Sequence, residues 1–271
     1  MTHIAVSETF GPTMSPLPIG RIPLLLGLLT AFVASSAEIG AQEATLSEVL
    51  AAHAEHCGDL QRLRAITSVV EHSLADTSAA TPQIRVLRAK APDKIRIETL
   101  TETGRLIQGF DGTTAWTLLE PRLGTARSVP VSPDAARALR LSALLALHNP
   151  VLNAEALGLS AALRDNDPDA DGQHLVVVSS SSLELMRLRV ERETGRPLGR
   201  IEYAAGRRVV TRFEAFRLVE GVAWPATTTT TTEDGGSVTW RLVHTRLDEE
   251  LPDSLFTPPP GMPVTPLGSS T

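Results

Sequence analysis

The stretch LIQGFDGTTAWTLLEP, residues 106–121, places an Asp-Gly step between two runs that are rich in apolar and β-branched residues. Asp111-Gly112 favours a two-residue type I′ turn, because such a turn needs positive φ at both central residues. Alternation groups three residues on one face before the turn and three after it, namely Leu106, Gln108 and Phe110, then Thr114, Trp116 and Leu118. The stretch therefore predicts a β-hairpin with one apolar side, and its faces rather than its turn are the place to look for function.

Similar segments of alternating or β-branched residues occur on both sides of this hairpin, separated by short polar turns. Several strands at such spacing indicate an antiparallel meander. The predicted strands cover residues 66–74, 83–90, 94–101, 105–110 and 113–119, and then 172–180, 183–192, 199–205, 208–219, 224–232 and 237–247. The threonine run 227–232 counts as part of a strand, because threonine is β-branched and a turn signal, EDGG, follows it.

Two segments show helical periodicity instead. Residues 44–66 place apolar side chains near helical spacing, and Gly58 divides this segment in two. Residues 132–158 begin with Ser132 followed by proline, which is favourable at the first helical position, and carry a strongly leucine-rich face. A long one-sided sheet must cover its apolar side. The apolar helix at 132–147 is the predicted cover.

Composition places the chain among globular proteins. It has 271 residues, of which 42% are hydrophobic and 21% charged, and its formal net charge is −6. The negative balance argues against nucleic acid as a partner, which would require a basic face. The single cysteine, Cys57, cannot form an internal disulfide, so stability must come from a packed core.

The N-terminal segment has the character of an export signal. Arg21 precedes the apolar run 22–37, which is shorter than the ~20 residues of a membrane span. Ser35 and Ala37 occupy the −3 and −1 positions of a cleavage site. We therefore expect residues 1–37 to be a cleaved signal peptide and the protein to be exported, with an uncleaved N-terminal anchor as the alternative.

Motifs for catalysis or metal binding are weak. Residues 165–172, DNDPDADG, match the start of a calcium loop, but its twelfth position is Val178 instead of a bidentate glutamate. Residues 53–57, HAEHC, bring together ligand types that suit soft metals, without a second ligand cluster. No nucleophile elbow and no phosphate-binding glycine loop is present. We therefore expect no enzyme, no catalytic residues, no metal and no cofactor.

The order of elements resembles the periplasmic lipoprotein-carrier superfamily (LolA/LolB-like), and specifically its outer membrane lipoprotein-sorting protein relatives. The resemblance covers most of residues 44–264 and rests on KAPDKIRIE at 90–98, FDGTTAWTLLEP at 110–121 and PDSLFTPPPGMPV at 252–264. It implies an α+β, mainly antiparallel fold, an incomplete open barrel of about eleven strands whose concave face is covered by helices. The half-barrel domain would span 38–264, followed by a flexible tail at 265–271. The carriers have a basic residue before the proline of the first motif, where this chain has Ala91.

The resemblance implies an exported, non-enzymatic protein that holds lipid or lipoprotein acyl chains between the concave sheet and a helical lid. Its partner would be a lipid or an acylated protein. The residues expected to line the cavity are Ile95, Ile97, Leu106, Phe110, Trp116, Leu141, Leu145, Leu188, Phe213, Trp240 and Leu242. The alternative for each of them is a place in the hydrophobic core. The alternative function is an envelope sensor or protein-interaction module with a filled core, whose partner would be an envelope protein.

Overall fold

The computed structural model describes residues 44–76, 83–181, 183–204 and 206–267. These residues belong to one compact unit, Glu43–Thr271. The expected signal peptide, 1–37, lies outside the described residues, so its cleavage stays a prediction. Among the helices in the described ranges, none has the length and apolarity needed to cross a membrane.

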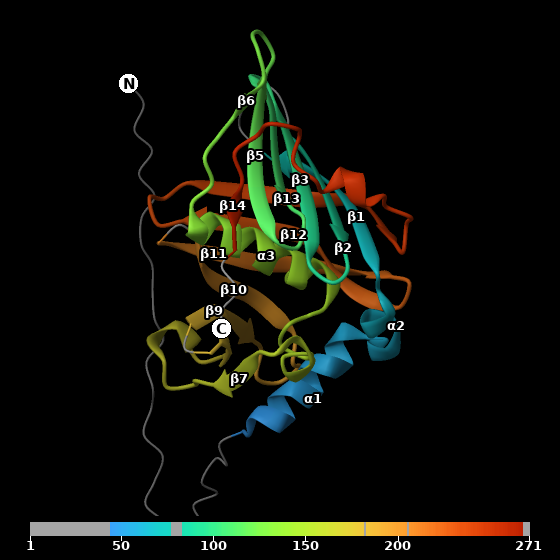
Figure 1. Ribbon diagram of the computed structural model, residues 1–271. Coiled ribbons are helices and arrows are strands. Elements are labelled where there is room, and N and C mark those ends of the chain that lie inside the picture. Colours follow the sequence, from blue (N-terminus) through green and yellow to red (C-terminus); the bar gives the residue numbers. More distant parts are fainter. Residues whose placement is uncertain (1–43, 77–82, 182, 205, 268–271) are drawn as a thin grey trace, which may run out of the picture. The chain divides into compact units, whose positions relative to one another are not determined.

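Fourteen antiparallel strands form one continuous sheet in the described part of the chain (Figure 1). They are β1 Ser68–Asp76, β2 Ile84–Lys90, β3 Lys94–Thr101, β4 Gly104–Phe110, β5 Thr114–Pro121, β6 Arg127–Ser128, β7 Ser160–Leu163, β8 His174–Ser180, β9 Leu183–Val190, β10 Pro197–Ala204, β11 Arg207–Val219, β12 Val222–Thr232, β13 Ser237–Leu247 and β14 Thr265–Pro266. Their order is β14-β5-β4-β3-β2-β1-β13-β12-β11-β10-β9-β8-β7, with β6 paired to β5. The sheet is open, since its two ends do not pair with each other. This confirms the mainly antiparallel, unclosed architecture.

The expected number of about eleven strands is too low. The eleven segments predicted from alternation correspond to β1–β5 and β8–β13. The additional strands β6, β7 and β14 contain two, four and two residues. Segments this short show no readable period of two. β14 also lies within the tail expected at 265–271, and it pairs with β5 instead of leaving the sheet.

The Asp-Gly hairpin is present, but its turn is not of type I′. Gly112 has a φ of +100°, whereas Asp111 keeps a negative φ. The Asp111 carboxylate accepts hydrogen bonds from the backbone N–H groups of Thr113 and Thr114, at 2.9 and 2.8 Å, and from both threonine hydroxyls. A side chain therefore organises this turn, as short polar residues commonly do.

Three α-helices accompany the sheet in the described ranges: α1 Leu46–Cys57, α2 Leu60–Ala65 and α3 Pro133–Leu147, with 3₁₀ helices at Glu155–Leu157, Pro168–Ala170 and Asp253–Leu255. Thr45 caps α1 in a reciprocal capping box, and Gly58, at φ +83°, separates α1 from α2 as expected. Ser132 caps α3 by accepting a hydrogen bond from the Ala135 N–H. The start signals in the sequence are confirmed.

The apolar helix predicted at 132–147 as the cover of the sheet is confirmed by α3, but the helical period seen over 132–158 does not continue beyond it. α3 stops at Leu147 because Asn149 adopts a φ of +41° and Pro150 cannot continue the helical hydrogen bonds. The rest of the predicted range forms turns and the 3₁₀ helix Glu155–Leu157.

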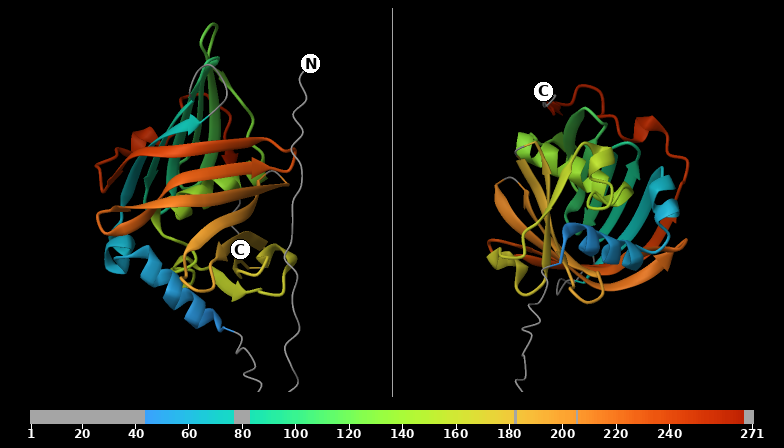
Figure 2. Two further views of the ribbon diagram at one scale, coloured as in Figure 1. Left: turned by 180° about the vertical axis from the view of Figure 1, so that it is seen from behind. Right: turned by 90° about the horizontal axis from the view of Figure 1, so that it is seen from below.

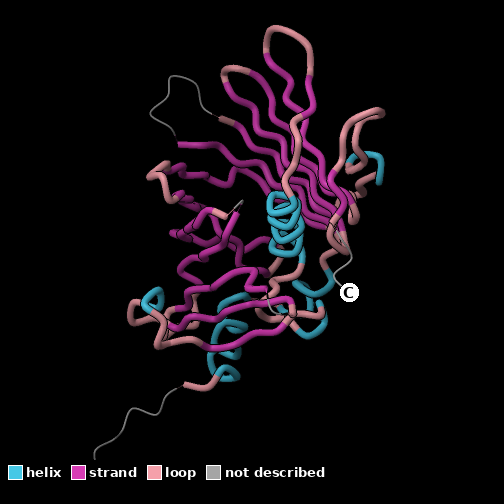
Figure 3. Tube along the Cα trace, turned by 60° about the vertical axis from the view of Figure 1, so that its left-hand side comes forward, coloured by secondary structure: helices cyan, strands magenta, loops and turns pink. Residues whose placement is uncertain are grey.

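The sheet curves around α3, which lies on its concave side (Figures 1 and 2). Figure 3 shows the helix with strands on two sides of it. One side of α3 packs into a core cluster with β1–β5, through Ala136, Leu139, Ala143 and Leu147. Leu141 packs into a second cluster with Val49 of α1 and with β8 and β9. The helix thus joins the two arms of the curved sheet.

We predict that Asp111→Ala lowers the free energy of unfolding by about 1–3 kcal/mol, because it leaves the donors of the turn, including the partly buried Thr114 N–H, without their acceptor. Asp111→Asn keeps one amide oxygen as acceptor and should lose less than half of that amount. Urea unfolding of the three proteins measures both values. An unchanged free energy of unfolding in Asp111→Ala would show that the carboxylate does not organise the turn.

Candidate functional site

Two cavities lie between α3 and the concave face of the sheet. The first has a volume of about 130 Å³ and is bounded by α1, α3 and strands β9–β12. The second has a volume of about 190 Å³ and is bounded by α3, β1–β3 and β10–β13. The cavities adjoin, because they share Leu145, Ala146, Arg200, Phe213, Trp224 and Pro225.

Six of the residues expected at a ligand cavity line one or both of these spaces: Ile97, Leu145, Leu188, Phe213, Trp240 and Leu242. Ile95 and Phe110 are instead fully buried in the core cluster beneath α3. Leu141 is buried in the second cluster, against β8 and β9. Leu106 is half-buried on the face that Phe110 occupies, outside both cavities.

Trp116 lies on the convex face and does not line the cavities. Phe110 pairs with Ala115 and Gly109 with Trp116, so the indole shares the face of Gly109. Paired residues on neighbouring strands point to the same face of a sheet, and successive residues along a strand alternate between faces. Phe110 and Ala115 point to the concave face, so Gly109 and Trp116 point to the convex face. The Trp116 Nε1–H donates to the Phe256 carbonyl oxygen at 2.8 Å. This tryptophan anchors the C-terminal segment against the outside of the sheet.

Polar contacts hold α3 near its middle and just beyond its C-terminus. Near its middle, Arg140 Nε lies 3.0 Å from a carboxylate oxygen of Asp93, in the turn between β2 and β3. Just beyond its C-terminus, His148 Nε2 lies 2.8 Å from the Pro92 carbonyl oxygen. Lys90 points to the other side of the sheet, where its ammonium donates to the Leu251 carbonyl oxygen at 2.8 Å. The contacts to the helix thus come from the residues that follow Ala91.

Sequence reasoning missed the charged residues of the second cavity. Arg85, Arg200 and Glu71 line it together with the apolar residues. Burial lowers the pKa of Arg85 below its usual value; the charge of Glu71 opposes this shift and that of Arg200 adds to it. The available signal was the position of Arg85 in β2, because alternation places it on the same face as Leu87 and Ala89.

A buried polar cluster borders the first cavity. His53 and Cys57 lie one turn apart on α1, with Cys57 Sγ 3.6 Å from His53 Nε2. Asn149 Nδ2 lies 3.3 Å from His53 Nε2 and 3.4 Å from Cys57 Sγ. His53 Nδ1 lies 3.1 Å from the Gly195 carbonyl oxygen. Since a carbonyl only accepts, Nδ1 carries the proton and Nε2 is the acceptor.

This cluster lacks the electrostatics of a cysteine nucleophile. Burial raises the pKa of the Cys57 thiol to about 11. Burial also lowers the pKa of His53 to about 4, against the opposing effect of the hydrogen bond to Gly195. A reactive cysteine requires a lowered thiol pKa. In the part of the chain that the structure describes, no three His, Cys, Asp or Glu side chains are arranged to hold a metal.

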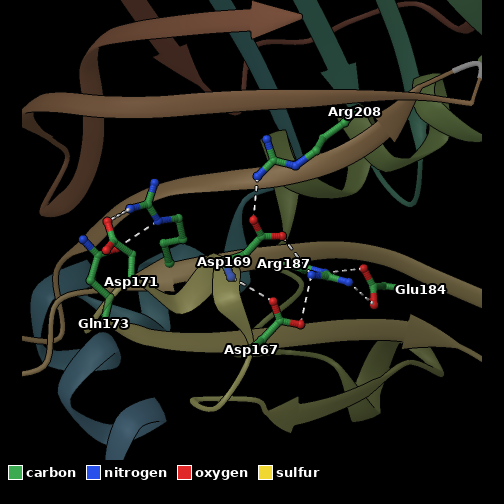
Figure 4. A network of polar contacts seen from close by, with 8 residues as sticks. Asp167, Asp169, Asp171, Gln173, Glu184, Arg187 and Arg208 are labelled. Carbon is green, nitrogen blue, oxygen red and sulfur yellow. Dashed lines mark hydrogen bonds and ion pairs between the residues drawn. The ribbon is translucent and has the colours of Figure 1, made fainter. Parts of the chain in front are cut away.

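In the calcium-like loop, residues 165–172, the aspartates form ion pairs with arginines of neighbouring strands (Figure 4). Arg187 of β9 forms ion pairs with Asp167 at 3.1 Å, Asp169 at 2.9 Å and Glu184 at 2.6 Å. Arg208 of β11 pairs with Asp169 at 2.7 Å. The guanidinium groups neutralise the carboxylates where a cation would have to bind, and they fasten this loop to the sheet.

Comparison with known proteins gave no matching family model and no similar curated protein. Similar solved structures include a LolA superfamily protein from Nitrosomonas europaea, with 14% identity, coverage of 79% of this chain and 98% of that chain, and a TM-score of 0.44. A domain named as an outer membrane lipoprotein-sorting protein from Vibrio parahaemolyticus has 12% identity, coverage of 78% and 97%, and a TM-score of 0.46. A DUF1329 family protein from Desulfovibrio piger has 13% identity, the same coverage and a TM-score of 0.46. The first of these belongs to the superfamily that the sequence motifs resemble.

We predict that His53 makes stability depend on pH. Between pH 6.5 and 4 the unfolded chain binds a proton at His53 and the folded chain does not, so stability falls as the pH falls, by on the order of 3 kcal/mol over the whole window. His53→Gln removes this titration. Urea unfolding between pH 4.5 and 7 should therefore show a flatter pH dependence for His53→Gln than for the unaltered protein.

Parallel pH profiles for the unaltered protein and His53→Gln would contradict the burial of a neutral imidazole.

Proposed function

We propose that this protein is an exported, non-enzymatic carrier that binds a lipid acyl chain between α3 and the concave face of the sheet. The observation that carries the proposal is the pair of adjoining cavities on either side of Leu145 and Ala146, between a helix and a curved sheet. Most of the shared lining is apolar. Each methylene group buried there contributes about 0.8 kcal/mol, whether aliphatic or aromatic side chains form the wall.

Movement of α3 is part of the proposal. Cavities of about 130 and 190 Å³ are smaller than the ~300–1,000 Å³ of common ligand sites. A long chain therefore requires the helix to shift away from the sheet. The Arg140–Asp93 contact supports such a shift, because an exposed arginine forms it and such ion pairs contribute only ~0–1 kcal/mol. Ligand binding would then favour a more open arrangement of the helix.

The second candidate function, a protein-interaction module, is favoured by an exposed apolar row on the convex face. Leu74, Ile84 and Leu100 lie side by side on β1, β2 and β3, and each is at least 38% exposed. Adjacent exposed apolar side chains of this kind can mark a protein contact. This row lies on the opposite side of the sheet from the cavities, so binding of a chain and binding of a protein can be tested separately.

The three tryptophans allow a direct test of the cavity. Trp224 and Trp240 line the second cavity, whereas Trp116 lies on the convex face. Bromine atoms quench tryptophan fluorescence at contact distance. We predict that a dodecanoic acid brominated in mid-chain quenches most of the fluorescence of the Trp116→Phe variant, and that unbrominated dodecanoic acid reverses the effect. Fluorescence titration measures both results.

Leu145→Asp places a carboxylate between the two cavities and should abolish the quenching in the Trp116→Phe background. Leu123→Asp is the matched control, because Leu123 is 89% exposed, and it should leave the quenching unchanged. Far-UV circular dichroism establishes that both variants are folded. Absence of quenching in the Trp116→Phe protein at saturating chain would refute acyl binding at this site and would favour the interaction module.

A further inference from the structure

The second cavity has two chemically different walls. Leu145 and Ala146 of α3 form an apolar wall. Across from them, Arg85 of β2 and Arg200 of β10 project from the concave face into the same space. Each guanidinium lies over an aromatic ring, since Arg85 Cζ is 4.5 Å from the centre of the Trp240 ring and Arg200 Cζ is 5.8 Å from that of Phe213. Such stacking fixes the plane of the cation while leaving its edge free for hydrogen bonds.

Arg85 differs from several other partly buried arginines of the sheet, which form ion pairs. Arg88 and Arg96 both form ion pairs with Glu98, at 2.6 and 3.0 Å, and Arg187 contacts three carboxylates. Within the described ranges, Arg85 contacts the Trp240 ring and has no carboxylate at ion-pair distance. Its guanidinium makes no hydrogen bond to another described residue, so its N–H donors are available to a ligand in the cavity. An unpaired, partly desolvated cation is costly, and an oxyanion ligand would remove that cost.

Arg200 adds unsatisfied donor capacity to the same space. Its Nε is buried and has no hydrogen-bond partner among the described residues, although it forms an ion pair with Glu202 at 3.5 Å. The carboxylate among the lining residues, Glu71, accepts a hydrogen bond from the Trp224 indole. Arg200 has Glu202 as its counter-ion, so Arg85 is the cation of the lining that has no ion pair among the described residues. Ser73 and Thr211 contribute hydroxyls to the same wall.

We propose that Arg85, assisted by Arg200, binds the oxyanion of an anionic single-chain amphiphile whose hydrocarbon chain extends under α3 into the first cavity. The inference rests on the proposed function and specifies its ligand class. A carboxylate and a phosphate both offer the planar or forked acceptor geometry that a guanidinium binds in bidentate fashion. A neutral acyl group, such as the one on an acylated protein, would leave Arg85 unpaired. The site therefore selects an acidic lipid over a neutral acyl anchor.

The test compares three ligands with the same twelve-carbon chain length: dodecanoic acid, dodecyl phosphate and methyl dodecanoate. Calorimetric titration of the full-length protein gives the three dissociation constants. Both anions should bind at least tenfold more tightly than the ester. Tighter binding of one anion identifies the carboxylate or the phosphate as the natural group. Arg85→Gln should weaken binding of the anions by about 10- to 100-fold, as expected for a lost charge-assisted hydrogen bond, and leave binding of the ester unchanged.

Arg241→Gln is the matched control, because Arg241 is the neighbour of Trp240 on β13 but points to the opposite face, where it pairs with Asp76. It should bind all three ligands like the unaltered protein. Arg85→Lys keeps the charge without the bidentate geometry. Its affinity for the two anions should lie between that of the unaltered protein and that of Arg85→Gln. Equal binding of acid and ester, with no effect of Arg85→Gln, would overturn the oxyanion site while leaving acyl binding intact. Absence of binding by all three ligands would overturn both proposals.

Discussion

The covering of one apolar sheet face is the constraint on which the rest of this structure depends. A curved antiparallel sheet exposes its concave face to water unless another element fills the curve. Here one helix, α3, makes contact with both arms of the sheet, through Leu139 and Leu147 on one side and Leu141 on the other. A cylinder cannot fill a wider concave surface completely. The cavities beside Leu145 are the part of the curve that the helix leaves unfilled.

Much of the fold could be predicted because alternation and helical periodicity are local signals. The eleven longer strands, the break at Gly58 and the start of α3 at Ser132 all follow from such signals. The two-residue strands β6 and β14 could not be predicted, because pairing with β5 alone defines them. The end of α3 was predictable in principle from Pro150, but the apolar residues that follow it extended the apparent helix.

The candidate site was less predictable than the fold, since it depends on which strands meet across the curve. Period two identifies which side chains share a face within a strand, but it does not say how two strands are aligned. Trp116 shows the consequence, because the pairing of Phe110 with Ala115 sends this indole to the convex side. Ile97, Phe213 and Trp240 come from strands far apart in the chain, and the order β3-β2-β1-β13-β12-β11 brings them together.

Charged residues on an apolar face distinguish a ligand site from a core that is merely underpacked. Arg187 and Arg208 neutralise the acidic loop beside β8, and the loop is thereby fixed (Figure 4). Arg85 forms no ion pair of this kind within the described residues, and a partly desolvated cation without an ion pair lowers stability. An aliphatic side chain on the same face would pack against α3 at lower cost. Retaining the guanidinium there is consistent with a ligand that carries the missing negative charge.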